Sequence, residues 1–343
     1  MTPGKKDKMT LYMLRNALST LVIAFISFMI SLISFYECSF LEALRRLFFV
    51  NIYTTLYFLL LWLLNYMIFE ISKIIFDTYE NILTYKKDPS FTPQMKEDIC
   101  SILQCAGLIH DIGNPPFGHF GEVAIREWFE RNLPRLTFKG EPVDQVLTEQ
   151  MKQDFYHFEG NTQAFRVVTR LHFLVDEHGM NLTKALLGTI IKYPVSSLEI
   201  DKDSGDIRTK KMGYFHGDRE NFQDVQESTG TLGKRHPLAF ILEAADDIAY
   251  KTADIEDAVK KGCISYERLL AELKAYKAGS QTNHYVQIVS WLEEKYGKAV
   301  GKGYDRPDQS AVQNWIISGQ GQMISGGPDC FAGNYESIME GTY

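Results

Sequence analysis

The chain has 343 residues, of which 45% are hydrophobic and 23% are charged, and its formal net charge is −7. This length is long for one domain, and the composition is typical of a folded globular protein rather than a disordered one. The acidic balance argues against a general nucleic-acid binder, so a single-stranded nucleic acid effector is not expected. The five cysteines are scattered without a C-x-x-C pair, so they indicate neither a zinc knuckle nor a disulfide framework.

Two apolar stretches without a charged residue stand in the first part of the chain, at residues 17–36 and 47–69. Each is long enough to cross a hydrocarbon layer of about 30 Å as a helix. The sequence therefore predicts two transmembrane helices and a membrane as a partner. Lysines before the first stretch and after the second favour a hairpin with both ends in the cytoplasm. The alternative is a pair of core helices in an unusual soluble domain.

We divide the chain into four parts and expect an all-α fold. Residues 1–72 are the apolar segment, 73–94 a linker, 95–275 a helical body, and 276–343 a helical or irregular tail. Apolar residues at helical spacing predict helices over 95–110, 120–132, 161–177, 182–191 and 237–260. The polar, glycine-bearing stretch 202–219 is expected to form a loop or hairpin.

The strongest chemical signal is the pair His110-Asp111 at the end of a predicted helix. An adjacent His and Asp can give one metal ion an imidazole nitrogen and a carboxylate oxygen. The Gly-Asn-Pro-Pro turn that follows brings the chain back, and His119 and Glu122 share one face of the next helix. A His beside a carboxylate is a natural acid–base or water-positioning pair. Without this turn, the pair would more often be a helix cap.

A second signal is the acidic stripe of the predicted helix 237–260. Asp246, Tyr250 and Asp254 are spaced by four residues and fall on one face. Acids in an otherwise apolar helix are costly to bury without a cation, which favours a metal beside Asp246. Tyr250 and Asp254 would then reach a sugar or a phosphate one and two turns further on.

Three motifs in order carry a specific resemblance: the stretch 110–122, His157-Phe-Glu-Gly-Asn161, and Glu243-Ala-Ala-Asp-Asp-Ile248. Together they resemble the bacterial dGTPase family of HD-domain metal-dependent phosphohydrolases, over about residues 90–275. The resemblance implies an HD-type helical core, a divalent metal ion such as Mg or Mn, a homo-oligomer, and a cytoplasmic catalytic domain. It also implies hydrolysis of a deoxynucleoside triphosphate to a deoxynucleoside and inorganic triphosphate.

The same resemblance implies roles for individual residues. The metal ligands are His110, Asp111 and Asp246, the catalytic pair is His119 and Glu122, the triphosphate is held by Lys192, Tyr193 and Lys211, and the sugar side is contacted by Tyr250 and Asp254. Two alternatives stay open on the residues themselves. Lys192-Tyr193 before Pro194 could be a simple helix end. His157 and Glu159 either line the pocket or cap the helix that follows.

The chain departs from the family pattern at its N-terminal side. The HD pattern needs a further metal-ligating His upstream, and no His precedes His110 in this sequence. We expect either a genuine membrane-anchored variant or, preferably, a segment from a shifted reading frame and hence a fragment, with weakened metal binding. The alternatives to a dNTP triphosphohydrolase are an HD phosphohydrolase for another nucleotide or phosphoester, and an inactive nucleotide-binding fragment.

Overall fold

The computed structural model describes residue 74 and residues 90–172, 178–279 and 283–343. All of them belong to one compact unit, Ile68–Tyr343. The predicted transmembrane stretches at 17–36 and 47–69 lie outside the described residues. In the part of the chain that the structure describes, no helix is both long and apolar enough to cross a bilayer.

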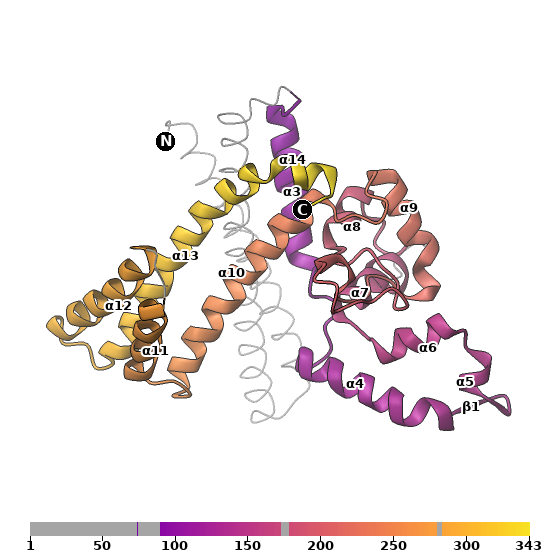
Figure 1. Ribbon diagram of the computed structural model, residues 1–343, viewed down its shortest axis with the longest axis horizontal. Helices are drawn as coiled ribbons and strands as arrows, with labels where there is room; N and C mark the ends of the chain where they lie inside the picture. The colour runs from indigo at the N-terminus through magenta and orange to yellow at the C-terminus, as the bar shows by residue number, and fades with distance from the viewer. Residues whose placement is uncertain (1–73, 75–89, 173–177, 280–282) are drawn as a thin grey trace, which may run out of the picture. The chain divides into compact units, whose positions relative to one another are not determined.

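Helices make up most of the described chain, which confirms the all-α expectation at that level (Figure 1). The α-helices are α3 (Pro93–Ile109), α4 (His119–Asn132), α5 (Val143–Val146), α6 (Glu149–Tyr156), α7 (Gly160–Arg166), α8 (Lys184–Ile190), α9 (Arg219–Thr229), α10 (Pro237–Lys260), α11 (Tyr266–Gly279), α12 (Asn283–Gly301), α13 (Pro307–Gly333) and α14 (Tyr335–Glu340). Among the described residues the only sheet is a two-stranded antiparallel hairpin, β1 (Thr137–Phe138) with β2 (Glu141–Pro142). Helical spacing did not predict this hairpin.

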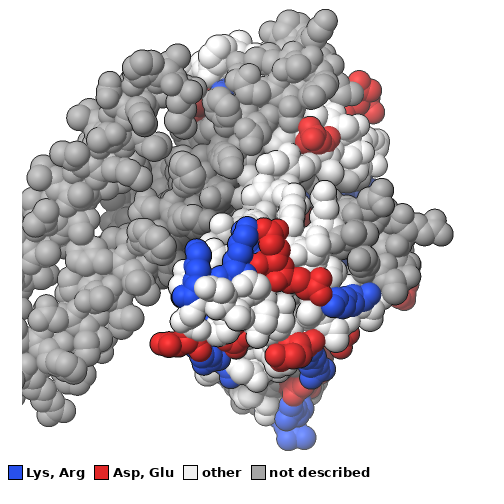
Figure 2. Space-filling view, turned by 90° about the vertical axis from the view of Figure 1, so that its left-hand side faces the viewer, with Lys and Arg blue, Asp and Glu red and all other residues white. Residues whose placement is uncertain are grey.

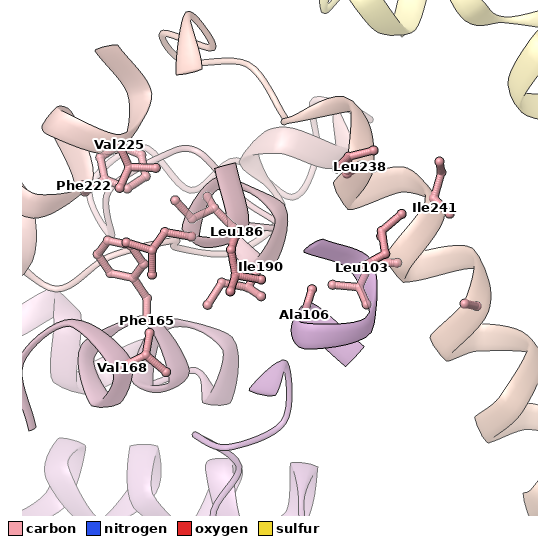
Figure 3. Packing of buried hydrophobic residues seen from close by; sticks show 14 of the residues in the cluster. Leu103, Ala106, Phe165, Val168, Leu186, Ile190, Phe222, Val225, Leu238 and Ile241 are labelled. Atoms are coloured by element: carbon pink, nitrogen blue, oxygen red, sulfur yellow. The ribbon is translucent and has the colours of Figure 1, made fainter. Parts of the chain in front are cut away.

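The main hydrophobic core is built around the short helix α8. Figure 3 shows Leu186 and Ile190 of α8 in the centre, with α3 and α10 on one side of them and α7 and α9 on the other. Leu103 of α3 and Phe165 of α7 are fully buried in this cluster. Because α3 and α10 both pack on the same core, the C-terminal end of α3 is held close to the middle of α10.

Helix α10 begins and ends where the sequence predicted, at Pro237 and Lys260. The start is fixed by His236, whose side chain accepts a hydrogen bond from the amide of Leu238 at 3.3 Å. Proline follows at the first helical position, where its missing N–H costs nothing. His236 and Pro237 therefore set the start of α10.

The helix predicted over 161–177 is interrupted. Its α-helical part ends at Arg166, and a π-helical turn follows over Val167–Leu171. The carbonyl of Val168 accepts a hydrogen bond of 2.8 Å from the amide of Met180, so a segment outside the helix uses an acceptor of this turn. A Cβ on Gly179 would lie 2.4 Å from the same carbonyl oxygen, so the chain can return this closely only with glycine there. Apolar spacing alone did not reveal this break.

The tail is helical over most of its described length. Helices α11, α12 and α13 enclose a second apolar cluster with the end of α10, centred on Leu292, Val312 and Trp315. The division proposed at residue 276 falls inside α11, and the domain boundaries stay predictions. On the face drawn in Figure 2, acidic and basic side chains lie interspersed rather than gathered by sign.

Candidate active site

The turn between α3 and α4 packs directly on the start of α7, and two glycines make that contact possible. A Cβ on Gly113 would lie 2.0 Å from the amide nitrogen of Ala164 and 2.2 Å from the carbonyl oxygen of Gly160. A Cβ on Gly160 would lie 2.1 Å from Oδ1 of Asn114. Gly113 needs a residue without a side chain because it faces backbone atoms, whereas a side chain at Gly160 would displace the amide of Asn114. The backbone therefore joins the His-Asp motif to the motif at 157–161.

His110 lies at the end of α3 and faces two carboxylates. Its Nε2 lies 3.5 Å from Oδ2 of Asp111 and 3.3 Å from Oδ1 of Asp246 on α10. Its Nδ1 lies 2.9 Å from the carbonyl oxygen of Gly107, to which it donates in the tautomer that leaves Nε2 unprotonated. The other oxygen of Asp246 accepts from Nζ of Lys192 at 3.0 Å. The structure thus brings three predicted metal ligands together with one predicted phosphate contact.

These contacts set the electrostatics of the group. Burial would lower the pKa of His110, but its contact with Asp246 and the charge of Asp111 outweigh burial and raise the pKa. Burial would raise the pKa of Asp246, but His110 and Lys192 outweigh it and lower the pKa to about 2. Asp246 is therefore a charged carboxylate at neutral pH, and its two oxygens contact His110 and Lys192.

The donor chemistry of this group fits a divalent cation, although its arrangement is not a closed metal cage. An imidazole nitrogen oriented by a backbone carbonyl and two carboxylates are ligands for Mn²⁺, Fe²⁺ or Zn²⁺. In the part of the chain that the structure describes, no three or more His, Cys, Asp or Glu side chains are arranged to hold a metal ion. Nζ of Lys192 supplies part of the positive charge that Asp246 needs.

His119 and Glu122 form a second polar pair, on the first turn of α4. Nδ1 of His119 lies 2.9 Å from Oε2 of Glu122. Oε1 of Glu122 accepts a hydrogen bond of 2.7 Å from the amide of Gly160. The imidazole is 81% exposed while the carboxylate is 3% exposed, so the pair presents an accessible ring on a fixed, buried anchor. This is the geometry of a group that can position or activate a water molecule.

A network of two cations and one further carboxylate surrounds Glu122. Arg126 lies 3.4 Å from Glu122 and 3.9 Å from Glu159, and Lys211 lies 2.9 Å from Glu159. Burial would raise the pKa of Glu122, but the hydrogen bonds from His119 and Gly160 outweigh it, and the pKa is lowered. For Glu159 burial prevails over Lys211, and the pKa is raised. The two buried carboxylates therefore differ in their electrostatic environment.

The remaining predicted residues fall in two places. Tyr193 follows Lys192 and is buried, and burial with the nearby charge of Glu243 raises its pKa to about 12. Tyr250 and Asp254 lie one and two turns beyond Asp246 on α10, and both are exposed. Their predicted sugar contacts stay predictions.

One member of this network, Arg126, was not singled out in the sequence, and the role of another, Glu159, was left open. Arg126 follows Glu122 by four residues, a spacing that places the two on one helix face and was a usable signal. The sequence left open whether Glu159 caps the following helix or lines the pocket. It stands at the start of α7 but makes no capping hydrogen bond, and its carboxylate binds Lys211 instead. The structure therefore favours the pocket.

Known proteins with a similar sequence are named as deoxyguanosinetriphosphate triphosphohydrolases or as proteins like them. The chain is 44% identical over 257 residues to a deoxyguanosinetriphosphate triphosphohydrolase-like protein of Listeria monocytogenes, which is 75% of this chain and 54% of the relative. It is 34% identical over 272 residues to a deoxyguanosinetriphosphate triphosphohydrolase of Yersinia enterocolitica, 71% of this chain and 51% of the relative. This chain is a homologue of the bacterial dGTPases. The resemblance found in the three motifs is confirmed.

The dGTPase relationship holds over a limited part of the relatives. The chain spans about half the length of the Listeria and Yersinia proteins. A probable deoxyguanosinetriphosphate triphosphohydrolase of Pseudomonas aeruginosa is 42% identical over 184 residues, 36% of its own length. No protein-family model matches the chain. The dGTPase family implies a divalent-metal-dependent hydrolase.

Proposed function

We propose that the chain hydrolyses a deoxynucleoside triphosphate, dGTP or a broader set, to a deoxynucleoside and inorganic triphosphate. The observation that carries this proposal is the approach of Asp246 on α10 to His110 at the end of α3, at 3.3 Å. Residues 136 positions apart share this polar contact, and the motif that carries His110 also carries the His119–Glu122 pair with its buried carboxylate. The sequence relatives, whose names state a triphosphohydrolase, support the same chemistry.

The proposed roles follow the chemistry of each group. His110, Asp111 and Asp246 hold a divalent cation, which when bound supplies positive charge to a phosphate and acidifies water. His119 receives or positions the proton of the attacking water, and Glu122 fixes the imidazole from its buried side. Tyr250 and Asp254 contact the sugar side.

The triphosphate needs positive charge from the protein as well. Lys192 and Lys211 supply it, each now bound to a carboxylate that a phosphate would replace or share. Tyr193 is a neutral phenol at neutral pH, so its O–H can donate a hydrogen bond to a phosphate oxygen. The chain is further proposed to form a homo-oligomer and to adopt the HD-type core.

Product analysis tests the proposal. The full chain is incubated with each dNTP and Mg²⁺ or Mn²⁺, and deoxynucleoside and inorganic triphosphate are quantified. We expect equal amounts of both products, and none from Asp111→Ala. Release of a nucleoside monophosphate with pyrophosphate would favour a different HD phosphohydrolase. Binding of nucleotide without any product would identify a nucleotide-binding chain that lacks the activity.

A further inference from the structure

The residues that we assign to the phosphates lie on one long connection, residues 191–218, between α8 and α9. Lys192 and Tyr193 lie at its start, and Lys211 lies near its end. Its only regular structure is two short 3₁₀ turns, and a connection of this length in a compact domain is uncommon without a function. The placement of Lys192 relative to Lys211 therefore depends on the contacts that fix the two ends of this connection.

The two ends of the connection run against each other. The amide of Gly213 donates a hydrogen bond of 2.9 Å to the carbonyl of Val195. A Cβ on Gly213 would lie 1.7 Å from the carbonyl oxygen of Tyr193, so only glycine allows so close an approach. We call residues 193–197 the first arm of the connection and residues 212–216 the second arm.

One buried carboxylate on α6 receives a hydrogen bond from each arm. Oδ1 of Asp154 accepts from Oγ of Ser197 in the first arm at 2.6 Å, and Oδ2 accepts from the amide of His216 in the second arm at 2.6 Å. Gln150, one turn earlier on α6, contacts the same two residues. Its carbonyl accepts from Oγ of Ser197 at 3.3 Å, and its Oε1 lies 3.3 Å from Nδ1 of His216. Helix α6 therefore holds both arms at once.

The type of side chain at this position is informative. Asp154 is 4% exposed, and among the residues described no Lys or Arg forms an ion pair with it. Burial raises its pKa, and the hydrogen bonds from His216 and Ser197 oppose that rise. A buried carboxylate without a cation is costly for stability. Its advantage is geometric, because a carboxylate offers two acceptor oxygens and no donor, and the two arms present two donors.

We propose that Asp154 is a positioning residue for substrate binding, which fixes the two arms so that Lys192 and Lys211 face the triphosphate together. The inference rests on the proposed function, because it takes both lysines as phosphate contacts. Asp154 acts through Ser197 and His216 rather than by touching the substrate. Each of these two residues follows one of the lysines by five positions, so a shift of either arm moves the lysine next to it.

Hydrogen–deuterium exchange of the full chain, followed by mass spectrometry, tests this positioning without any turnover. Asp154→Asn replaces one acceptor oxygen by an NH₂ group, which cannot accept a hydrogen bond from an arm. We expect the backbone amides of both arms to exchange at least tenfold faster in this variant, and the amides of α10 to keep their rates. Glu149→Gln is the matched control, because Glu149 lies on the same helix with its side chain 63% exposed. It should change the rates in the arms by less than twofold.

A second control separates the arms from the stability of the whole fold. Leu292 is fully buried in the apolar cluster of α11–α13, and Leu292→Ala leaves a cavity there. We expect this variant to speed exchange more in α11–α13 than in the arms, the reverse of Asp154→Asn. Faster exchange spread evenly over the chain of Asp154→Asn, or unchanged exchange in its arms, would overturn the inference.

Kinetics separate positioning from a role in the reaction step. For Asp154→Asn we expect KM for dGTP to rise at least fivefold while kcat stays within twofold of the unmodified chain. Ser197→Ala removes one of the two bonds, so it should raise KM by less, and it replaces Asp154→Asn if that variant does not fold. Unchanged KM in both variants would contradict the inference even in a chain that hydrolyses dNTPs.

The failure of the proposed reaction has a different signature. If the unmodified chain hydrolyses nothing, the reaction proposal fails, and the affinity for dGTP measured by calorimetry replaces KM in the same comparison. Weaker dGTP binding by Asp154→Asn, with faster exchange in its arms, would then still support the positioning role. A chain that neither hydrolyses nor binds dGTP contradicts both proposals.

Discussion

The carboxylate of Glu122 on α4 accepts a hydrogen bond of 2.7 Å from the amide of Gly160 at the start of α7. This bond ties the motif at 110–122 to the motif at 157–161. Its donor is a backbone group that has no helical partner at a helix start, so the carboxylate satisfies it. The other oxygen of Glu122 faces His119 at 2.9 Å. One side chain therefore both anchors α7 and orients the imidazole that we assign to water activation.

Replacement of Glu122 by Gln tests that double role. The amide keeps an acceptor for Gly160 but removes the negative charge beside His119. We expect kcat for triphosphate release to fall by about 10²–10⁴-fold, the usual contribution of a positioned acid–base pair. The thermal midpoint should change by only a few degrees. Glu127→Gln is the control, because Glu127 is exposed and pairs with Arg131 on the same helix. Activity above a third of normal in Glu122→Gln would contradict the assignment.

Replacement of Gly113 by Ala tests the packing that joins the two motifs. The new Cβ would meet backbone atoms of Ala164 and Gly160 at 2.0 and 2.2 Å, and neither can move aside as a flexible side chain could. We expect a loss of about 3 kcal/mol in unfolding free energy, at the upper end of overpacking. Gly297→Ala in α12 is the matched control, since its Cβ meets nothing within 4 Å. The unfolding free energy of that variant should rise by about 0.5–1 kcal/mol, because alanine has a higher helix propensity than glycine. Urea unfolding of both variants measures the difference, and similar effects would contradict the account.

His236 makes the stability of the fold depend on pH. Burial lowers its pKa from 6.5 to about 4, so the folded state holds a neutral ring and the unfolded state binds the proton more readily. The contribution of neutral His236 to the free energy of unfolding is fully present above pH 6.5 and is lost as pH falls toward 4. The expected loss is about 3 kcal/mol over that window.

His236→Asn removes the titrating ring while keeping a residue that can cap α10. Thermal midpoints at pH 8 and pH 5 should fall less in the variant than in the unmodified chain. An equal fall in both chains would show that the pH dependence lies elsewhere.

Replacement of Lys192 by Ala should strengthen metal binding and weaken substrate binding. Nζ of Lys192 lies 3.0 Å from Oδ2 of Asp246, so this ammonium competes with a metal ion for the carboxylate. Removing it should tighten Mn²⁺ binding several-fold, because the carboxylate loses a competing cation. The same change should raise KM for the dNTP, because a phosphate contact is lost. Weaker Mn²⁺ binding together with unchanged KM would reject both roles.

Local signals in the sequence predicted much of the fold. Helix α10 was predicted at its observed bounds because apolar residues at helical spacing run from Pro237 to Lys260. The π-helical turn after Arg166 was missed, because its cause is a hydrogen bond from Met180, which returns from outside the helix. Spacing within a helix carries no information about such a contact.

Some contacts of the candidate site could likewise be predicted from local spacing, and others could not. Proximity of His119 to Glu122 follows from their spacing on one helix. Proximity of Asp246 to His110 depends on how α3 and α10 pack, so the residues alone could not give it and the family resemblance suggested it. The cost of burying Asp246 predicted a metal ion beside it, and this stays a prediction. The structure shows Lys192 in contact with that carboxylate, so a metal is no longer the only way to offset that cost.

Binding of Mn²⁺, followed by electron paramagnetic resonance in the full chain and in Asp246→Asn, tests the central claim most directly. Asp247→Asn is the control, since Asp247 is the next residue of α10 and is paired with Lys251 at the surface. We expect the unmodified chain and Asp247→Asn to bind one Mn²⁺ ion with similar affinity, and Asp246→Asn to lose it. Equal binding by all three chains, or no binding by the unmodified chain, would contradict a metal-dependent site between His110, Asp111 and Asp246.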